Sequence, residues 1–279
     1  MTKNKINLPD WIGSQETRTE TIHQQALNGF AALMDQDVPA SPFVPAGGHW
    51  LYFLPTDRQS NLALDGHSYK GGFLPPVDLP RRMWAGGRLI FDRPIKAGDV
   101  IEKTSTVKSI KEKEGRTGKL VFVTVEHELK GSDGRYILEE HDIVYRDAPT
   151  ENAPVKKPEQ ASTDYDWSET ITPDPVMLFR YSALTYNGHR IHYDRDYVMD
   201  VEGYPGLIVH GPLIGTLLMK LAVENMTGKS LKNFEFRNFN PIFDTAPFKL
   251  CGKQMDDTLC SVWAMGPDGE LAVSATAQF

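Results

Sequence analysis

The sequence predicts an α+β fold made of two related halves, each combining an antiparallel sheet with a helix packed against it. Three features indicate this class: a faint internal repeat, runs of strands with alternating apolar residues, and one long apolar helix over residues 210–228. Such periodicities are the main sequence signals of helix and strand, and a repeat indicates duplicated units. Because the inner face of each sheet needs an apolar cover, we expect the two sheets to join edge to edge in one body.

The composition is that of a folded globular chain. Its 279 residues are 40% hydrophobic, and its net charge of −7 argues against a nucleic-acid binder, which needs a basic face. Residues 1–13 show no apolar segment of a signal peptide, and no apolar run approaches the ~20 residues of a transmembrane helix. We therefore expect a cytoplasmic protein with no nucleic-acid or membrane partner.

Residues 147–164 divide the chain. This segment is rich in proline, lysine and glutamate and has no apolar period, which predicts an exposed linker. It separates an N-terminal half, residues 1–146, from a C-terminal half, residues 165–279.

Each half ends in a run of predicted strands. In the first half, Val121, Val123 and Val125 alternate with polar or aromatic residues, as in a strand with one buried face. The turn "GSDG" at 131–134 corresponds to "GPDG" at 266–269, and Asp-Gly turns suit tight antiparallel connections.

The repeat continues upstream of these strands. The stretch "GFAALMDQDVPASPF", 29–43, aligns with "RYSALTYNGHRIHYD", 180–194. In this alignment Ser41 faces His192, so the first half has no histidine where the second has one. We interpret the halves as the products of a duplication.

The segment 210–228 predicts a buried helix. Pro212 suits its first turn and Gly228 suits a position just past its end. The segment is apolar around most of its circumference. In the corresponding place the first half has residues 66–87, whose prolines and glycines are incompatible with a long helix. We therefore expect the first-half helix to be degraded, which would leave room for a bulky or branched ligand.

The two cysteines, Cys251 and Cys260, match no zinc or redox spacing and are expected to be buried free thiols on strands. His189, His192 and Asp194 are residue types that bind metals. No cysteine or second ligand cluster lies near them, and we predict no metal and no other cofactor.

The stretch "YSALTYNGHRIHYD" followed by "GLIVHGPL" resembles the MaoC-like hydratases and dehydratases. More narrowly, with "LPRRMWAGGRLIF" at 79–91, it resembles the hydroxyacyl-thioester dehydratase type 2 branch, which includes mesaconyl-C4-CoA and itaconyl-CoA hydratases. The resemblance covers nearly the whole chain. It implies a double hot-dog fold, in agreement with the repeat, and a hydro-lyase that adds water to an enoyl-CoA thioester or removes it.

The resemblance also implies catalytic roles in the second half, with the first half non-catalytic and shaping the substrate pocket. His192 takes the position of the family's catalytic histidine and would move the proton of the water. Asn187 takes the position of an aspartate in the wider group. Since an amide is no base near neutral pH, Asn187 would orient the water. The backbone N–H of Gly211, at the start of the buried helix, would stabilise the thioester oxygen.

Further residues are expected to line the substrate. Arginine binds phosphate and carboxylate well, and a dicarboxylyl-CoA carries both groups. The residues assigned to substrate binding are Arg81, Arg82, Arg88, Arg190, Tyr181 and His210. We expect Tyr181 to form part of the pocket wall, and His189 and Asp194 to hold the loop.

The predicted reaction is hydration of a short branched dicarboxylyl-CoA such as mesaconyl-C4-CoA or itaconyl-CoA. A 3-hydroxyacyl thioester dehydratase of fatty-acid synthesis is the alternative within enzymes, and the physiological direction stays open. A non-catalytic acyl-binding module and a hot-dog thioesterase are the alternatives from other classes. A homodimer is a reasonable expectation for the fold.

Overall fold

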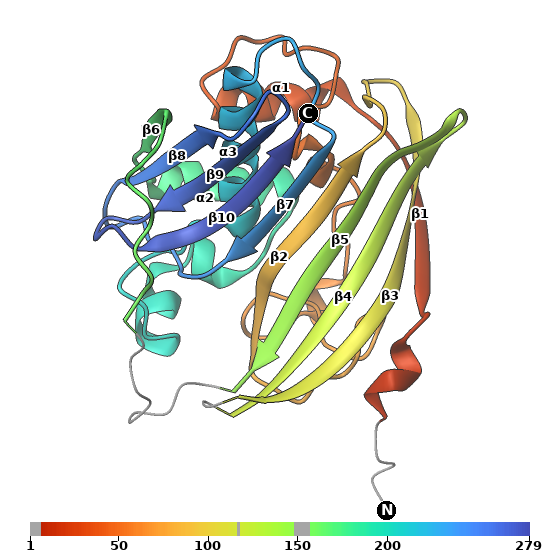
Figure 1. Ribbon diagram of the computed structural model, residues 1–279. Coiled ribbons are helices and arrows are strands. Elements are labelled where there is room, and N and C mark those ends of the chain that lie inside the picture. The colour runs from red at the N-terminus through yellow and green to blue at the C-terminus, as the bar shows by residue number, and fades with distance from the viewer. Residues whose placement is uncertain (1–6, 116–117, 148–156) are drawn as a thin grey trace, which may run out of the picture.

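The computed structural model describes residues 7–115, 118–147 and 157–279 (Figure 1). Within these residues ten strands form one antiparallel sheet, in the order β1-β3-β4-β5-β2-β7-β10-β9-β8-β6. The strands of the first half are β1 (Gln15–Thr21), β2 (Arg81–Phe91), β3 (Val100–Gly115), β4 (Gly118–Gly131) and β5 (Gly134–Arg146). Those of the second half are β6 (Trp167–Ile171), β7 (Asn233–Asn238), β8 (Phe248–Gln254), β9 (Leu259–Met265) and β10 (Leu271–Gln278).

Three α-helices lie behind this sheet in the view of Figure 1. They are α1 (Gln24–Leu33), α2 (Pro175–Thr185) and α3 (Gly211–Asn225). Short turns of other helix types are η1 (Leu8–Trp11), η2 (Gly48–Leu51), η3 (Gln59–Asn61), η4 (Arg190–His192) and η5 (Tyr197–Val201). None of the described helices is long and apolar enough to cross a membrane.

The two halves meet where β2 pairs with β7, so the predicted edge-to-edge junction is confirmed. The strand order on one side of this junction repeats the order on the other, with β2, β5, β4, β3 and β1 matching β7, β10, β9, β8 and β6. Glycine allows the close approach. A Cβ on Gly86 would overlap the carbonyl oxygen of Phe236, and one on Gly87 would lie 2.8 Å from the carbonyl oxygen of Glu140.

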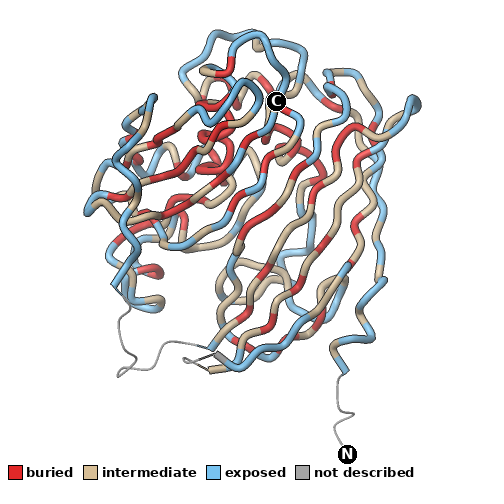
Figure 2. Tube along the Cα trace, in the orientation of Figure 1, coloured by how far each residue is buried: buried red, intermediate tan, exposed pale blue. Residues whose placement is uncertain are grey.

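The predicted helix of the second half is confirmed as α3, which packs against β7, β8, β9 and β10. Leu213, Leu217 and Leu218 are buried on it, and Figure 2 shows this part of the molecule as a continuous buried region. Gly228 follows the helix with a positive φ of 76°, a conformation that glycine adopts without strain.

The helix of the first half is degraded, as predicted, but its remnant lies earlier in the chain than residues 66–87. The backbone N–H of Val44 donates to Ile95 O at 2.8 Å, just as that of Val209 donates to Ile242 O at 2.8 Å. After Val209 the chain enters α3, whereas after Val44 it makes only the single turn η2. Residues 66–87 instead form a loop that leads into β2.

The predicted linker, 147–164, lies partly outside the described residues. Its described part, 157–164, is exposed but bound to the second half. The N–H of Ala161 donates to Gly269 O at 2.8 Å, and the indole of Trp263 donates to Ser162 O at 3.1 Å. Cys251 and Cys260 are buried free thiols on β8 and β9, as predicted.

Candidate active site

The motif loop, residues 186–209, begins where α2 ends. Asp174 caps the start of α2 by accepting from the N–H of Met177 at 2.8 Å. At the other end Tyr186 takes a left-handed conformation with φ of 49°, and the N–H of Asn187 donates to Ser182 O at 2.8 Å. This tight helix end fixes the direction in which the motif loop leaves α2.

His192 lies on η4 and is buried. Its Nδ1 lies 2.7 Å from the carbonyl oxygen of Ile208 and must donate to it, so Nε2 carries the lone pair. Burial lowers the pKa of His192 to about 4. The imidazole is therefore neutral near pH 7, with Nε2 free to act as a base.

The ring of His192 packs against His210, which in turn packs against Tyr181. The rings of His192 and His210 stack at 3.7 Å, and Tyr181 meets His210 edge-on at 4.9 Å. His210 Nε2 lies 2.8 Å from Ser182 Oγ, whereas its buried Nδ1 has no partner among the described residues. Burial and the neighbouring histidines hold the pKa of His210 well below its usual value. Of the two residues predicted for substrate binding, His210 thus lies directly against His192, and Tyr181 lies behind His210.

Gly211 is the first residue of α3, so its N–H precedes the hydrogen-bonded turns of the helix. A Cβ on Gly211 would lie 3.2 Å from Asn238 Nδ2 and 3.7 Å from the indole of Trp84. Asn238 Nδ2 donates to Trp84 O at 2.8 Å, but Asn238 Oδ1 is buried without a partner in the described chain. The start of α3 therefore lies against the Asn238 amide and the Trp84 indole, with a buried polar atom of Asn238 left without a partner among the residues that the structure describes.

Asn187 has a further local task. Its side-chain oxygen accepts from the backbone N–H of His189 at 3.0 Å. One acceptor site of Asn187 therefore holds the motif loop in shape, and the amide has less capacity left to receive a hydrogen bond from water.

Two residues of the first half also enter the site, and sequence reasoning missed them. The His67 ring lies 4.0 Å from that of His189, which lies 5.5 Å from that of His192. One polar atom each from Asp65, His67 and His189 can be chosen so that all lie within 4.8 Å of one another. The only sequence signal was the Asp65-Gly66 turn beside a histidine. Asp194, weighed earlier with His189 and His192 as a metal-binding set, instead pairs with Arg190.

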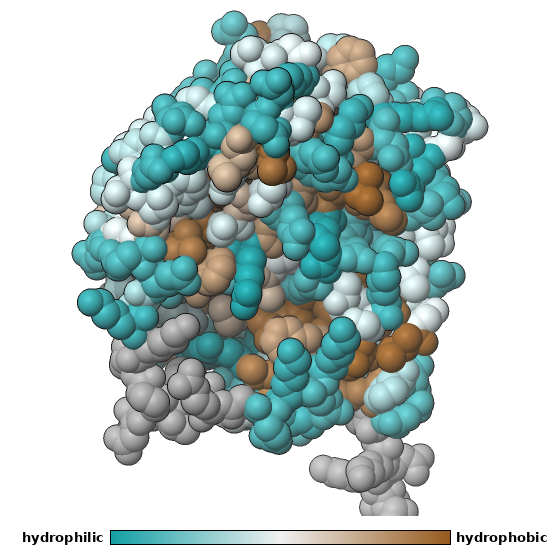
Figure 3. Space-filling view, viewed as in Figure 1, coloured by the Kyte–Doolittle hydropathy of each residue, from teal (hydrophilic) through white to brown (hydrophobic). Residues whose placement is uncertain are grey.

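Three of the four predicted substrate arginines are paired with carboxylates. Arg81 lies 3.5 Å from Glu202, Arg88 lies 2.8 Å from Asp142, and Arg190 lies 2.8 Å from Asp194, these being N–O distances. Arg88 is on the outer face of the sheet, a mostly hydrophilic surface with scattered apolar patches (Figure 3), so the structure does not bring it to the site. Arg190 braces the motif loop.

Arg82 differs from these three. It lies on the inner face of β2 opposite Tyr145, and no described carboxylate lies within 4.0 Å of its guanidinium. Its positive charge contributes to the lowered pKa values of His67 and His189, after the larger effect of their burial. Arg82 is thus an unpaired cation that acts on the histidines of the site.

A model described as hydroxyacyl-thioester dehydratase type 2 matches residues 47–244, which include the motif loop and α3. The chain belongs to the hydroxyacyl-thioester dehydratase type 2 family. The predicted family, and with it the expectation of a dehydratase-type enzyme, is confirmed.

Relatives and solved structures agree with this family. The chain is 43% identical over 273 residues, 96% of both chains, to mesaconyl-C(4)-CoA hydratase of Chloroflexus aurantiacus. It is 31% identical over 233 residues, 74% of this chain and 76% of the relative, to the mitochondrial hydroxyacyl-thioester dehydratase type 2 of Schizosaccharomyces pombe. A MaoC-like dehydratase from Phytophthora capsici superposes with a TM-score of 0.71 at 15% identity, covering 98% of each chain, which confirms the double hot-dog fold.

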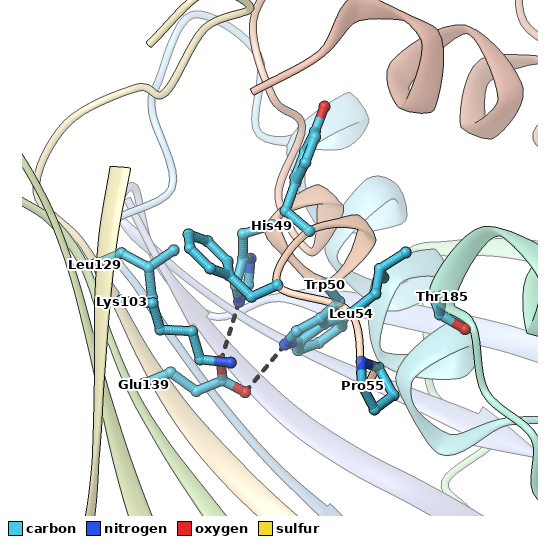
Figure 4. Close-up of a pocket in the computed structure, with 10 residues that line it drawn as sticks. His49, Trp50, Leu54, Pro55, Lys103, Leu129, Glu139 and Thr185 are labelled. Atoms are coloured by element: carbon cyan, nitrogen blue, oxygen red, sulfur yellow. Dashed lines mark hydrogen bonds and ion pairs between the residues drawn. The ribbon is translucent and has the colours of Figure 1, made fainter. Parts of the chain in front are cut away.

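In this type 2 dehydratase a cavity of about 140 Å³ lies in the first half, where the missing helix would have packed (Figure 4). Its buried Glu139 accepts from His49 at 3.1 Å and from the indole of Trp50 at 3.0 Å. Burial alone would raise the pKa of Glu139, but the His49 hydrogen bond and nearby histidines lower it overall. The Trp50 ring lies 5.3 Å from that of Trp84, so the two indoles stand between this cavity and Gly211.

Proposed function

We propose that this chain hydrates a short enoyl-CoA whose β carbon bears a carboxylate, with mesaconyl-C4-CoA as the leading substrate. The observation that carries this proposal is the Arg82 guanidinium on the inner face of β2, which has no described carboxylate within 4.0 Å and whose charge acts on His67 and His189. The relative from Chloroflexus aurantiacus, named mesaconyl-C(4)-CoA hydratase, supports the same substrate.

His192 supplies the proton transfer. Its Nε2 removes one proton from a water as the oxygen bonds to the β carbon. The same imidazolium then returns that proton to the α carbon, so that the elements of one water are added and the enzyme is regenerated. A base that stays neutral down to a pH of about 4 suits this cycle near neutrality.

The start of α3 stabilises the charge that develops meanwhile on the thioester oxygen. The Gly211 N–H and the positive end of the helix dipole both favour a negative oxygen at this point. The absence of a side chain at Gly211 lets the thioester approach, with Trp84 as the neighbouring wall.

Arg82 would bind the carboxylate of the substrate. In mesaconyl-C4-CoA this group is attached to the carbon that water attacks, and a guanidinium both anchors it and offsets its negative charge. A second observation favours a short acyl group. Trp84 and Trp50 lie between Gly211 and the first-half cavity, so they would prevent a longer acyl chain from reaching that cavity. The room predicted for a bulky acyl group is thus partly taken by these indoles.

A substrate panel with one matched pair of variants tests this proposal. Wild-type protein should hydrate mesaconyl-C4-CoA faster than crotonyl-CoA, which has no carboxylate. Arg82→Gln should lower kcat/KM for mesaconyl-C4-CoA by about 100-fold, as expected for a lost charge-assisted hydrogen bond, and that for crotonyl-CoA by less than about threefold. Arg237→Gln, an exposed arginine on the outer face of β7, is the control and should change neither.

The same panel separates the alternatives. The relative from Schizosaccharomyces pombe, named as a hydroxyacyl-thioester dehydratase, favours a role in fatty-acid synthesis, and higher rates on longer straight enoyl-CoAs would support it. Release of free CoA would indicate a thioesterase, and binding without turnover an acyl-binding module. Assays started from hydroxyacyl-CoA address the direction. A cytoplasmic location and a homodimer remain part of this proposal, and size-exclusion chromatography tests the dimer.

A further inference from the structure

The hairpin at residues 62–68 is built to reach the motif loop. The N–H of Ala63 donates to His67 O at 2.7 Å and that of Gly66 to Ala63 O at 3.0 Å, so the tip is a closed turn. The tip is bound to the motif loop through its backbone, because the N–H of Arg190 donates to Asp65 O at 2.9 Å. Gly66 has a φ of 89°, and a Cβ there would overlap the carbonyl oxygen of Gly188. Only glycine allows this contact between the two halves.

The hairpin presents an oriented imidazole. Asp65 Oδ1 accepts from the His67 N–H at 3.0 Å, and Oδ2 lies 3.1 Å from His67 Nδ1. Burial alone would raise the pKa of Asp65, but the hydrogen bonds from the ring and the backbone N–H of His67 hold it well below the usual range. The carboxylate of Asp65 is therefore ionised and accepts a hydrogen bond from the protonated Nδ1 of His67. The other ring nitrogen of His67, Nε2, then carries the lone pair.

This imidazole shares its surroundings with the base. A protonated His67 would lower the pKa of both His189 and His192, which places all three in one electrostatic environment. The charged and titratable groups around it are Asp65 on its own hairpin, His189 and His192 on the motif loop, and Arg82 on β2.

We propose that the Asp65–His67 pair of the first half belongs to the catalytic centre and supplies the water-holding group that Asn187 no longer provides as a carboxylate. His67 Nε2 accepts the hydrogen bond of one O–H of the attacking water, while His192 Nε2 takes the proton of the other. The first proton stays in the product hydroxyl and the second passes from His192 to the α carbon, so the balance is that of simple hydration. Asp65 is a positioning residue that acts through His67.

This inference rests on the proposed hydratase function, and two substitutions of one residue test it. A glutamine side chain can place its amide oxygen near the position of His67 Nε2, whereas an asparagine side chain reaches only the position of Nδ1. With the enoyl-CoA that wild type hydrates fastest, His67→Asn should lower kcat by about 100-fold, the scale of a misplaced reactant, while KM changes little. His67→Gln should lose only about tenfold. If His67 merely held the hairpin through Asp65, His67→Asn would be the more active variant, and that order would overturn the inference.

A rescue variant checks the same role independently. Asn187→Asp restores a carboxylate at the family position, so the double variant Asn187→Asp/His67→Asn should regain at least tenfold in kcat over His67→Asn. Asp65→Asn should lower kcat without raising KM. Asp256→Asn is its matched control, because Asp256 also accepts from the N–H two residues on, at 2.7 Å from Thr258, but lies in a distant turn. No recovery in the double variant would count against the inference.

Further outcomes separate the inference from the function it rests on. If His67→Asn keeps nearly full activity while His192→Ala loses it, the hydratase function stands and the role of the pair is wrong. If wild type hydrates no enoyl-CoA, the function itself is wrong. One bound metal per chain, measured by elemental analysis and lost together with activity in Asp65→Asn, would show that the pair binds a cation and would also overturn the inference. Thermal unfolding and CoA binding by calorimetry establish that each variant is folded.

Discussion

The two halves share the same order of strands and a first helix, and they differ in the position of their long loops. In the first half α1 ends with Asp35 at a φ of 53°, and the N–H of Gln36 donates to Ala31 O at 2.9 Å. The second half repeats this end, with Tyr186 at 49° and Asn187 donating to Ser182 at 2.8 Å. The sequence alignment is therefore correct as far as Gln36 and Asn187.

Beyond this point the halves diverge. The first half reaches its matching bridge, Phe43 with Lys96, seven residues after Gln36, whereas the second reaches Ile208 with Phe243 only after η4 and η5. The pairing of Ser41 with His192 therefore has no structural counterpart, because the second half inserts its motif loop here. The first half makes its own long excursion later, over residues 52–80, where the second half has α3.

The site lies where these two excursions meet. The N–H of Arg190 in one binds Asp65 O in the other, and the rings of His67 and His189 lie 4.0 Å apart. A duplication that was strictly symmetrical would have placed a helix over both halves of the sheet. In place of a helix equivalent to α3, the first half has a segment long enough to cross to the second half.

The largest effect on activity should come from removing His192, which only the second half has. His192→Ala should lower kcat for hydration by about 1,000-fold, the usual range for a general base, because the Nε2 that takes the proton of the water is lost. Coupled detection of the hydrated thioester measures this. His23→Ala, an exposed histidine before α1, is the control, and a His192 variant within tenfold of wild type would contradict the mechanism.

A smaller effect is expected from breaking the contact between the halves. In Gly66→Ala the new Cβ would overlap Gly188 O and would occupy a positive φ. The hairpin must then move away from the motif loop, and a shift of about 1 Å can cost about 100-fold in kcat. Steady-state kinetics and thermal unfolding of the same preparation test both parts of this expectation.

Gly228→Ala provides the control for Gly66→Ala. Gly228 also has a positive φ, 76°, but a Cβ there meets nothing within 4 Å. It should lose only about 1 kcal/mol of stability, the usual cost of this backbone conformation for alanine, and keep its kcat. Equal kinetics in the two variants would mean that the hairpin contact has no part in catalysis.

The sequence predicted the features that depend on local spacing. The helix over 210–228, the strands with their Asp-Gly turns, and the Asn187–His192 motif each lie within one short window, so their periodicity or spacing is visible. The position of Asp65 beside the motif loop was not visible. It lies more than 120 positions from the motif and reaches it only through the fold.

The arginines show how a local irregularity limits such prediction. In a regular strand Arg82 and Arg88 would point to the same face, because they are six residues apart. The bulge between Trp84 and Gly86 reverses the alternation, which leaves Arg82 on the inner face and Arg88 on the outer. The Gly86-Gly87 pair was the available signal, since glycine inside a strand often marks a bulge.

The smallest effect concerns His127, a half-buried histidine of the first half that lies outside the proposed site. His127 Nδ1 lies 2.8 Å from Ser105 Oγ, much as His210 bonds Ser182 in the second half. Burial, with a smaller contribution from Lys103, lowers the pKa of His127 to about 3. The unfolded chain, with a histidine pKa of about 6.5, therefore binds this proton first as the pH falls. The free energy of unfolding should drop by up to about 1.4 kcal/mol per pH unit from His127 alone between about pH 6.5 and 4.

Denaturant unfolding at several pH values between 7 and 4 measures this contribution of His127. In His127→Gln the slope of unfolding free energy against pH should be flatter by that amount, whatever the absolute stability of the variant, because glutamine does not titrate. Glu139 has a lowered pKa in the folded state, so the unfolded chain protonates it first and it adds its own slope below about pH 5.5. The contribution of His127 is therefore read between pH 7 and that value. A slope in His127→Gln equal to that of wild type would mean that His127 already gains its proton in the folded protein. The first-half histidine would then differ from the neutral, stacked His210 of the second half.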